Sequence, residues 1–599
     1  AAICAAATDS NGDGLKDITF RRRLSEVGSR TATANRNFFR IVVGLEGKLL
    51  HDRFSWDIGY NYGESSEQQH STGQVNVLNF LSALQATTNA AGAIVCANPI
   101  AVAQGCVPIN IFGAGSISPA ALAWVNADSQ HTFTLKQQVW DANVSGSLFD
   151  LPAGPLGVAI GAEYRRESSN EDWDALTNAG LNGGNVLPDT SGRFNVKEAY
   201  GEVNVPILKD LPFAKQLNLR AAGRISDYST IGSVKTWEIG GDYAPVEDIR
   251  FRATLAKAVR APNIGELFTG LSQTFPLLVD PCTGIGPTGG GTTGDNCRAA
   301  AGVAANIAAN GVFTLTQADR QGISGFNGGN PNLGPETGRT FTAGVVLAPR
   351  SIGFLRGLSL SVDYWHIKVD NAITLLNRQL ILNTCYQDGL AASCALITRN
   401  PAAIGAASSG SIKFVNDFSI NAASLTRSGI DTVLQYRRGL GTFLGSPLNM
   451  NARIAYTHLI KGFIIPAPGQ APDRQAGELG PPGVPKDKFD ASLGFDNRLW
   501  GINLTGTYIG KAYEDDQFLA LFGLGPNAIS IRPIFYLDGQ IRFTPARKFE
   551  FYVGANNITN VQAPLILSGS GFNTTGSNTD EAMYDVFGRR YYAGVRLRF

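Results

Sequence analysis

The stretch Tyr584-Asp-Val-Phe-Gly-Arg-Arg-Tyr-Tyr-Ala-Gly-Val-Arg-Leu-Arg-Phe599 decides the fold, because from Arg590 onward one face is apolar and the other strongly polar. In a strand, successive side chains point to opposite faces, so Val595, Leu597 and Phe599 share one face. The opposite face carries Arg590, Arg596 and Arg598. In a soluble sandwich the polar face would meet bulk water, whereas in an outer-membrane barrel the apolar face meets lipid and the arginines meet a wet lumen. Whether this alternation recurs along the chain decides between a soluble sandwich and an outer-membrane barrel.

The alternation does recur, in segments that begin at 19–27 and end at 549–556, and together with the closing strand they give about eighteen strands. The links between them fall into two lengths. Short links include 151–155, 244–248, 497–501 and 544–548, and long links are 71–130, 260–338, 371–427, 460–484, 512–530 and 558–583. Short turns at one rim and long loops at the other are typical of outer-membrane barrels.

These patterns predict an all-β fold, a transmembrane antiparallel β-barrel over residues 19–599 that follows a loop at 1–18. An even number of strands would place residues 1–18 at the rim of short turns. The charged residues of the strands should face inward, because a charge that faces lipid at the membrane midplane costs about 2–4 kcal/mol.

The composition limits the protein class. The chain has 599 residues with 44% hydrophobic content and a mean hydropathy of −0.03. No run approaches the ~18–20 apolar residues that a spanning helix needs, so a helical membrane protein is excluded and a barrel is not. The net charge of +1, without a basic block, argues against a nucleic-acid partner.

Six of the seven cysteines form local pairs inside the long links. The predicted disulfides join Cys96 with Cys106, Cys282 with Cys297, and Cys385 with Cys394. Disulfides that close short loops are typical of an oxidising compartment. Cys4 is left over: it either pairs with a cysteine upstream of this sequence or is a lone thiol. No pair has the CxxC spacing of a zinc site.

A polar segment near the start resembles the front of a calcium loop. Oxygen ligands would come from Asp9, Asn11, Asp13 and Asp17, with glycine at the sixth position. The twelfth position, where a bidentate carboxylate is expected, is Phe20. A structural calcium ion is therefore one interpretation, and a plain turn of Asx and glycine residues before a strand is the other. No other cofactor is expected.

Several motifs resemble one family. They are Trp237-Glu-Ile-Gly-Gly-Asp-Tyr243, Lys257-Ala-Val-Arg-Ala-Pro-Asn-Ile-Gly-Glu-Leu-Phe268, Asn330-Pro-Asn-Leu-Gly-Pro-Glu-Thr337, Val362-Asp-Tyr-Trp365 and Asn556-Asn-Ile-Thr559. In this order, and with the aromatic residue at the end of the closing strand, they resemble the barrel of TonB-dependent outer-membrane receptors. The resemblance implies a barrel of ~22 strands around an N-terminal plug. Plug, TonB-binding box and about four strands are absent from this sequence, so we expect the chain to be the C-terminal part of such a receptor.

The resemblance implies active uptake of a scarce, bulky nutrient, such as a siderophore or an oligosaccharide, across the bacterial outer membrane. The implied partners are the TonB complex of the inner membrane, acting through the plug, outer-membrane lipid and lipopolysaccharide, and the small-molecule nutrient, with a surface lipoprotein as a further option. Two alternatives are a passive pore and a barrel that anchors a surface partner. An enzyme is not expected, because the five histidines are scattered and none lies in a nucleophile motif.

Two sets of residues are candidates for the site. The lumen-facing set, which would hold a plug or line a water path, is Asp363, Asp538, Arg542, Arg590, Arg596 and Arg598. The set of aromatic platforms on the outer loops is Trp173, Phe268, Phe275, Phe326, Tyr386 and Phe518. The alternative for each aromatic residue is packing within its loop. In the 257–268 motif, Pro262 should end a strand while Leu267 and Phe268 pack the outer loop.

Overall fold

The computed structural model describes residues 22–276, 278–320, 323–405, 407–480, 483–520, 523–546, 548–566 and 578–598. The suggested calcium loop at Asp9, Asn11, Asp13 and Asp17 lies outside the described residues, as do Cys4 and the terminal Phe599. No helix in the described part is long and apolar enough to cross a membrane.

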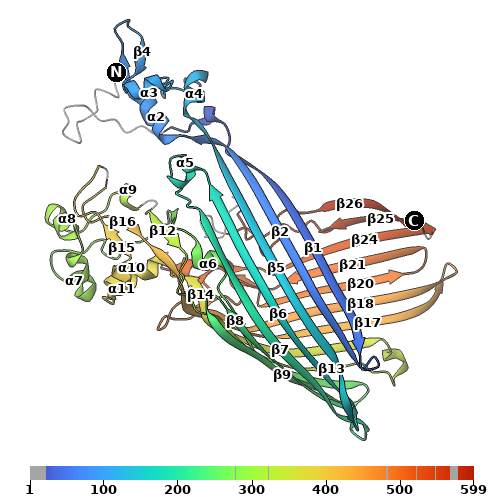
Figure 1. Ribbon diagram of the computed structural model, residues 1–599. Helices are drawn as coiled ribbons and strands as arrows, with labels where there is room; N and C mark the ends of the chain where they lie inside the picture. The colour runs from blue at the N-terminus through green and yellow to red at the C-terminus, as the bar shows by residue number, and fades with distance from the viewer. Residues whose placement is uncertain are drawn as a thin grey trace.

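One antiparallel sheet dominates the described chain, and seventeen of its strands are long (Figure 1). Those strands are β1 (Thr31–Leu49), β2 (Phe54–Val75), β5 (Asn126–Leu151), β6 (Gly154–Trp173), β7 (Thr190–Leu211), β8 (Ala214–Tyr228), β9 (Gly232–Val246), β10 (Ile249–Arg260), β13 (Glu336–Leu347), β14 (Leu358–Leu375), β17 (Asp417–Phe443), β18 (Ser446–Ile465), β20 (Asp487–Asp496), β21 (Trp500–Ile509), β24 (Ile534–Ala546), β25 (Phe549–Asn556) and β26 (Arg590–Leu597). Each pairs with the next one in this order, so the sheet is an uninterrupted meander.

The meander has two edges in the described chain. Strand β1 pairs only with β2, and β26 pairs only with β25, as far as the described residues show. The strands therefore form a strongly curved sheet with two open edges (Figure 1). A complete ring of ~22 strands would need further strands between these edges.

The strand expected at 19–27 is wrong over its described part. Residues 25–27 form the 3-10 turn η1 (Ser25–Val27), and Gly28 follows with a φ of 97°, which breaks an extended backbone. Glu26 accepts a hydrogen bond from the backbone N–H of Gly115 (2.9 Å) and ties the turn to the loop after β2. With seventeen strands instead of an even number, β1 starts at the end of the long loops, not at the rim of short turns.

The two faces of the sheet differ in chemistry from edge to edge. In β26, Val595 and Leu597 are 57% and 50% exposed, and Ile541 and Phe551 on neighbouring strands are exposed as well. A soluble protein does not leave so large an apolar face open to water, and no layer of described residues covers it. The face needs an apolar surrounding, as a lipid bilayer provides.

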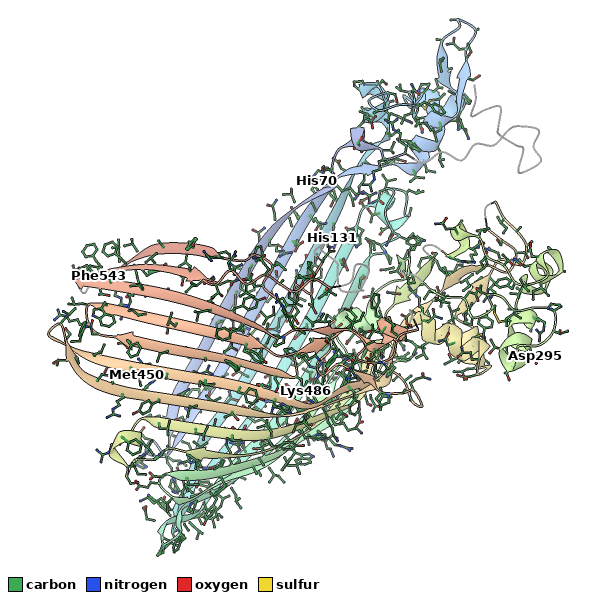
Figure 2. All side chains as sticks on the ribbon, turned by 180° about the vertical axis from the view of Figure 1, so that it is seen from behind. His70, His131, Asp295, Met450, Lys486 and Phe543 are labelled. Carbon is green, nitrogen blue, oxygen red and sulfur yellow. A yellow bond between two sulfur atoms is a disulfide. The ribbon has the colours of Figure 1, made fainter. Side chains whose placement is uncertain are left out.

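The long links gather at one end of the sheet and carry the short elements (Figure 1). The loops after β2 and β6 contain α2 (Val77–Leu84), β3 (Ala86–Thr88), β4 (Ile94–Cys96), α3 (Pro99–Ala103), α4 (Pro119–Val125) and α5 (Ala175–Asn178). At the other end the links are short, and the longest of them holds the 3-10 turn η2 (Gly353–Leu355). Figure 2 shows Phe543 at this short-turn end and Asp295 on a loop at the opposite end.

Two groups of loops fold into small bodies with cores of their own. The disulfide body comprises the described residues of 278–324 and 376–415 and packs around Cys282, Cys297, Phe313, Ile381 and Cys385. It contains α7 (Gly291–Ala299), α8 (Val303–Asn310), α9 (Gln317–Arg320), α10 (Arg378–Tyr386), α11 (Ala391–Cys394), β15 (Ile397–Arg399) and β16 (Ile412–Val415), while α6 (Ile264–Phe268), β11 (Ser272–Thr274) and β12 (Gly325–Gly328) connect it to the sheet.

The acidic body comprises the described residues of 466–486, 510–533 and 557–589. It contains β19 (Asp473–Arg474), β22 (Ala512–Tyr513), α12 (Asp516–Ala520) and β23 (Ser530–Ile531). Its core joins all three loops through Leu479, Ala512, Ile531, Ile566 and Tyr584.

Candidate functional site

The six predicted lumen residues lie on the polar face of the sheet, and five of them form ion pairs along the wall. Glu550 is the common partner at the C-terminal edge, with an oxygen 2.7 Å from Arg596, 3.6 Å from Arg598 and 3.8 Å from Arg542. Arg590 lies 3.4 Å from Asp585. Glu550 was not among the predicted lumen residues. On an alternating strand it shares the polar face with Tyr552, two residues further on, so the pattern could have placed it there.

The two predicted carboxylates, Asp363 and Asp538, also have hydrogen-bond partners within the wall. Arg252 donates two hydrogen bonds to Asp363, at 2.8 and 2.6 Å, from the strand two positions away. Asp538 accepts a hydrogen bond from the backbone N–H of Asn557 (2.7 Å). These contacts fix the polar wall internally, and a role in holding a plug remains a proposal.

A polar groove runs along β7, β8 and β9 on this face. Three cavities of about 550, 410 and 710 Å³ follow one another from the loop end to the short-turn end. Tyr228 and Val259 line both the first and the second cavity, and Glu202 and Glu238 line both the second and the third. The shared residues make the cavities adjoining parts of one groove.

The groove walls are charged, with acidic and basic side chains in equal number. Arg224 lies 3.1 Å from Glu198 and stacks over the ring of Tyr200, with its guanidinium carbon 4.5 Å from the ring centroid. Arg220 lies 3.0 Å from Glu238 nearer the short turns. Each arginine has an acidic partner, so the groove offers hydrogen-bonding groups at a wet surface and no unpaired cation among these residues.

The family-like motif at 257–268 closes the groove at its loop end. Arg260 donates to Glu266 of the same motif at 2.9 Å and to Glu336 of the 330–337 motif at 2.6 Å. Asn263 and Glu266 form a reciprocal capping box that starts α6. Pro262 is buried and Leu267 is 1% exposed. The two motifs therefore hold each other, which supports the structural role expected for this segment.

The six aromatic candidates do not gather in one place. Within the described chain no ring contact joins two of them: Trp173 stacks on His131 with centroids 4.0 Å apart, and Phe326 contacts Phe414 edge-on at 6.4 Å. Phe268 packs against β7 at Gly192, and Phe518 lies half-buried in α12 of the acidic body. Phe275 is 49% exposed beside the disulfide body and remains the most accessible platform.

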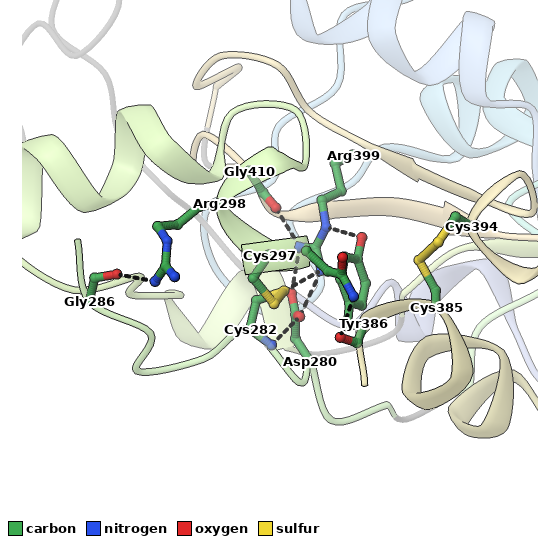
Figure 3. The surroundings of a disulfide bond; sticks show 11 residues. Asp280, Cys282, Gly286, Cys297, Arg298, Cys385, Tyr386, Cys394, Arg399 and Gly410 are labelled. Atoms are coloured by element: carbon green, nitrogen blue, oxygen red, sulfur yellow. Dashed lines mark hydrogen bonds and ion pairs between the residues drawn. A yellow bond between two sulfur atoms is a disulfide. The ribbon is translucent and has the colours of Figure 1, made fainter. Parts of the chain in front are cut away.

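Tyr386 was expected as an exposed platform, and this is wrong, because its side chain is 4% exposed in the core of the disulfide body. The three predicted disulfides, Cys96–Cys106, Cys282–Cys297 and Cys385–Cys394, are present. Figure 3 shows the last two, with Tyr386 next to Cys385 in the chain. The Tyr386 hydroxyl accepts a hydrogen bond from Nε of Arg399 at 2.7 Å.

Arg399 and Asp280 form a fully buried ion pair in this body (Figure 3). The two guanidinium Nη atoms donate to the two carboxylate oxygens of Asp280, both at 2.7 Å. Nη1 also donates to the carbonyl of Gly410 at 2.6 Å. The carboxylate and the phenol beside it hold the pKa of Arg399 above its ordinary value, in spite of the burial that lowers it.

The acidic body has the opposite character. Burial raises the pKa of Glu478 to about 8 and the pKa of Glu514 to about 7. Both carboxylates lie in loops outside the long strands. Sequence reasoning missed them, because they belong to two different loops and share no local motif.

The comparison with protein families decides what this arrangement is. The model of the TonB dependent receptor-like β-barrel matches residues 6–558. The chain belongs to the TonB-dependent receptor family. It is accordingly a β-barrel protein of the bacterial outer membrane, and its exposed apolar face is the lipid face.

Among solved structures, PirA shares the fold, and two others show a lower similarity. The siderophore receptor PirA from Acinetobacter baumannii has a TM-score of 0.51 and 14% identity, over 95% of this chain and 63% of that one. The ferric enterobactin receptor PfeA from Pseudomonas aeruginosa gives 0.49 and 13%, over 95% and 80%. The copper transporter OprC gives 0.48 and 10%, over 94% and 66%. Comparison with curated protein sequences gives no match. The chain thus spans less than two thirds of the length of PirA.

Proposed function

We propose that this chain forms the wall and outer loops of a receptor that takes up a bulky small molecule across the outer membrane with energy from the TonB complex. The observation that carries the proposal is the polar groove, which runs the length of an outer-membrane wall and ends beneath folded outer loops. No group in the groove forms a nucleophile with a base, so binding and passage, rather than covalent chemistry, fit it best.

The ligand would meet the outer loops first. Phe275 offers an exposed ring on the segment that leads into the disulfide body, and Arg165, Glu167 and Glu171 line the first cavity of the groove. Such a combination of a ring and hydrogen-bonding groups suits planar or polyhydroxylated ligands. A ferric siderophore and an oligosaccharide are the two classes we propose, the first because PirA, which shares the fold, is a siderophore receptor by name.

Whole-cell uptake tests the function. Cells with the full gene, without it, and with it in a TonB-deficient background receive radioactive iron bound to catecholate or hydroxamate siderophores, or labelled oligosaccharides. We expect at least one probe to accumulate only when both the gene and TonB are present. Accumulation that is independent of TonB, together with a large open conductance in planar bilayers, would instead establish a passive pore.

A point variant tests the site. Replacing the ring in F275A should weaken binding of the transported probe by about 1 kcal/mol or more, since exposed rings in binding sites contribute on this scale. The control is F354A, because Phe354 is 63% exposed at the opposite, short-turn end. Equal affinity in both variants would remove Phe275 from the binding surface without affecting the uptake proposal.

A further inference from the structure

Two outer loops of the acidic body are joined edge to edge by backbone hydrogen bonds. The N–H of Leu479 donates to the carbonyl of Tyr513, and the N–H of Tyr513 donates to the carbonyl of Gly477, both at 2.9 Å. A third loop joins them, since the N–H of Gly480 donates to the carboxylate of Asp580 at 3.2 Å. The junction brings together residues that lie 34 to 36 positions apart in the first two contacts and 100 positions apart in the third.

Three carboxylates converge at this junction. One oxygen each from Asp473, Glu478 and Asp515 lies within 4.8 Å of the other two. Glu478 is 1% exposed, and the other two are partly buried. Arg474 is the cation that contacts this group, with Nε 2.5 Å from Glu478 and Nη2 3.2 Å from Asp516. Asp473 and Asp515 have no ion pair among the described residues, so Arg474 alone does not neutralise the junction.

The second observation is the state of the oxygens themselves. Oε2 of Glu478 and Oδ1 of Asp473 are enclosed and have no hydrogen-bond partner among the described residues. Glu514, next to Asp515 in the sequence, is completely buried, and both of its oxygens are unpartnered within the described chain. A buried carboxylate without a partner is costly, so such a group takes up a proton, pairs with a cation or coordinates a metal.

The spacing of the oxygens is compatible with one shared Ca²⁺ ion. Two oxygens bound to the same Ca²⁺ at about 2.3–2.6 Å lie at most about 5 Å apart, and the oxygens of this cluster lie within 4.8 Å of one another. Mg²⁺ requires near-octahedral geometry and usually keeps several of its waters, so a group of three protein carboxylates suits Ca²⁺ better. The cluster offers only carboxylate oxygens, and hard oxygen ligands select Ca²⁺ over the softer transition metals.

We propose that Asp473, Glu478 and Asp515 bind a Ca²⁺ ion that ties the loop between β18 and β20 to the loop between β21 and β24. The ion supplies the counter-charge that Arg474 alone does not supply. Binding would order the loops on this side of the outer mouth and leave the disulfide body unchanged. None of its three ligands belongs to the polar segment at residues 9–17.

Calorimetric titration with Ca²⁺ tests the proposal, and the heat released on binding is the measured quantity. The sample is the full chain, purified in detergent and freed of calcium with EGTA. The site variant is D473N/D515N, which keeps side-chain shape but removes two charges. The matched control is D295N, an exposed carboxylate in the disulfide body, and D9N/D13N accounts for the N-terminal segment. For the wild type we expect a dissociation constant on the order of 10⁻⁴–10⁻³ M, as in extracellular modules. Binding should be about tenfold or more weaker in D473N/D515N and unchanged in D295N.

Trypsin provides a second readout on the wild-type protein alone. Lys486 and Lys511 are exposed and flank the junction, so Ca²⁺ should slow cleavage at both by about tenfold relative to EGTA, and Mg²⁺ should do so less (Figure 2 labels Lys486). The proposal is overturned if Ca²⁺ changes neither cleavage nor heat release in the wild type. It is equally overturned if a folded D473N/D515N, recognised by its heat-modifiable migration, binds Ca²⁺ like the wild type.

Discussion

The disulfide body and the acidic body stand at the same end of the sheet and bury charge in opposite ways. In the disulfide body, the buried Arg399 and Asp280 satisfy each other with paired hydrogen bonds, and two disulfides lie in the same core. In the acidic body, buried oxygens of Glu478 and Glu514 have no partner in the described chain, and three loops meet without a disulfide among the described residues. The difference teaches that one body carries its own cross-links, while the other depends on an ion from outside.

The largest expected effect breaks the internal pairing of the disulfide body. In R399M, the carboxylate of Asp280 stays buried without its partner, and breaking a buried pair in this way costs about 3–5 kcal/mol. Hydrogen exchange of the amides of α10 should report the loss, with the acidic body unaffected. R298M, which removes an arginine paired with an exposed carboxylate, should leave the exchange unchanged. The double variant D280N/R399M should recover much of the loss, and no recovery would contradict the pairing.

The next effect concerns the covalent link. Cys282 and Cys297 are 15 residues apart, and a disulfide that closes a loop of about 15 residues stabilises by about 3 kcal/mol. C282S/C297S should therefore increase proteolysis of the disulfide body, while cleavage at Lys486 in the acidic body stays as in the wild type. C96S/C106S, in the loop after β2, is the matched control. Equal proteolysis of both bodies after the loss of Cys282–Cys297 would show that they fold as one unit.

A smaller effect is pH-dependent. Burial raises the pKa of Asp417 from 3.8 to about 6, although Arg378 nearby lowers it. Since the folded state binds this proton more tightly than the unfolded state, stability is greatest at low pH and falls as pH rises from about 4 through about 6. D417N should remove this slope and add ~1–3 kcal/mol at pH 8. Protease sensitivity of the disulfide body from pH 4.5 to pH 8 measures it, and an unchanged slope in D417N would assign the dependence to another group.

The smallest effect separates the two bodies most cleanly. At a Ca²⁺ concentration about ten times the dissociation constant, binding stabilises the folded form by ~1.4 kcal/mol. Addition of EGTA should therefore loosen the acidic body by about this amount and leave the amides of α10 in the disulfide body unchanged. Hydrogen exchange of both bodies in a single sample checks this, and equal responses would remove the contrast between them.

The sheet was predictable because alternation is a local property. The segment 534–543 corresponds to β24 (Ile534–Ala546) almost residue for residue. By contrast, the segment 429–437 is only part of β17 (Asp417–Phe443), because the strand continues into the outer loops, where polar residues such as Asn421 and Ser424 hide the alternation. The opposite error occurred at 19–27, where the sequence alternates but Ser25–Val27 form a turn, because alternation alone does not provide a strand partner.

For the site, the sequence predicted only which face of its strand each residue occupies. Arg596 and Arg598 were placed correctly on the polar face by period two, but their shared partner Glu550 follows from cross-strand register. Tyr386 was misplaced, because burial beside Cys385 and Arg399 depends on how the loop folds back. Asp473 and Asp515 meet only through the pairing of two loops, so no pattern within either loop reveals them.

The central claim is that one face of this sheet contacts lipid and the other contacts water. Nitroxide labels placed one at a time at residues 549–555 of β25, in the full chain in lipid vesicles, test it most directly. We predict that collision with oxygen dissolved in the lipid is high at 551 and 553 and low at 552 and 554, and that a water-soluble nickel complex gives the opposite alternation. Labels that collide equally with both reagents at neighbouring positions, or labels at 551 and 553 that are shielded from both reagents, would contradict the account.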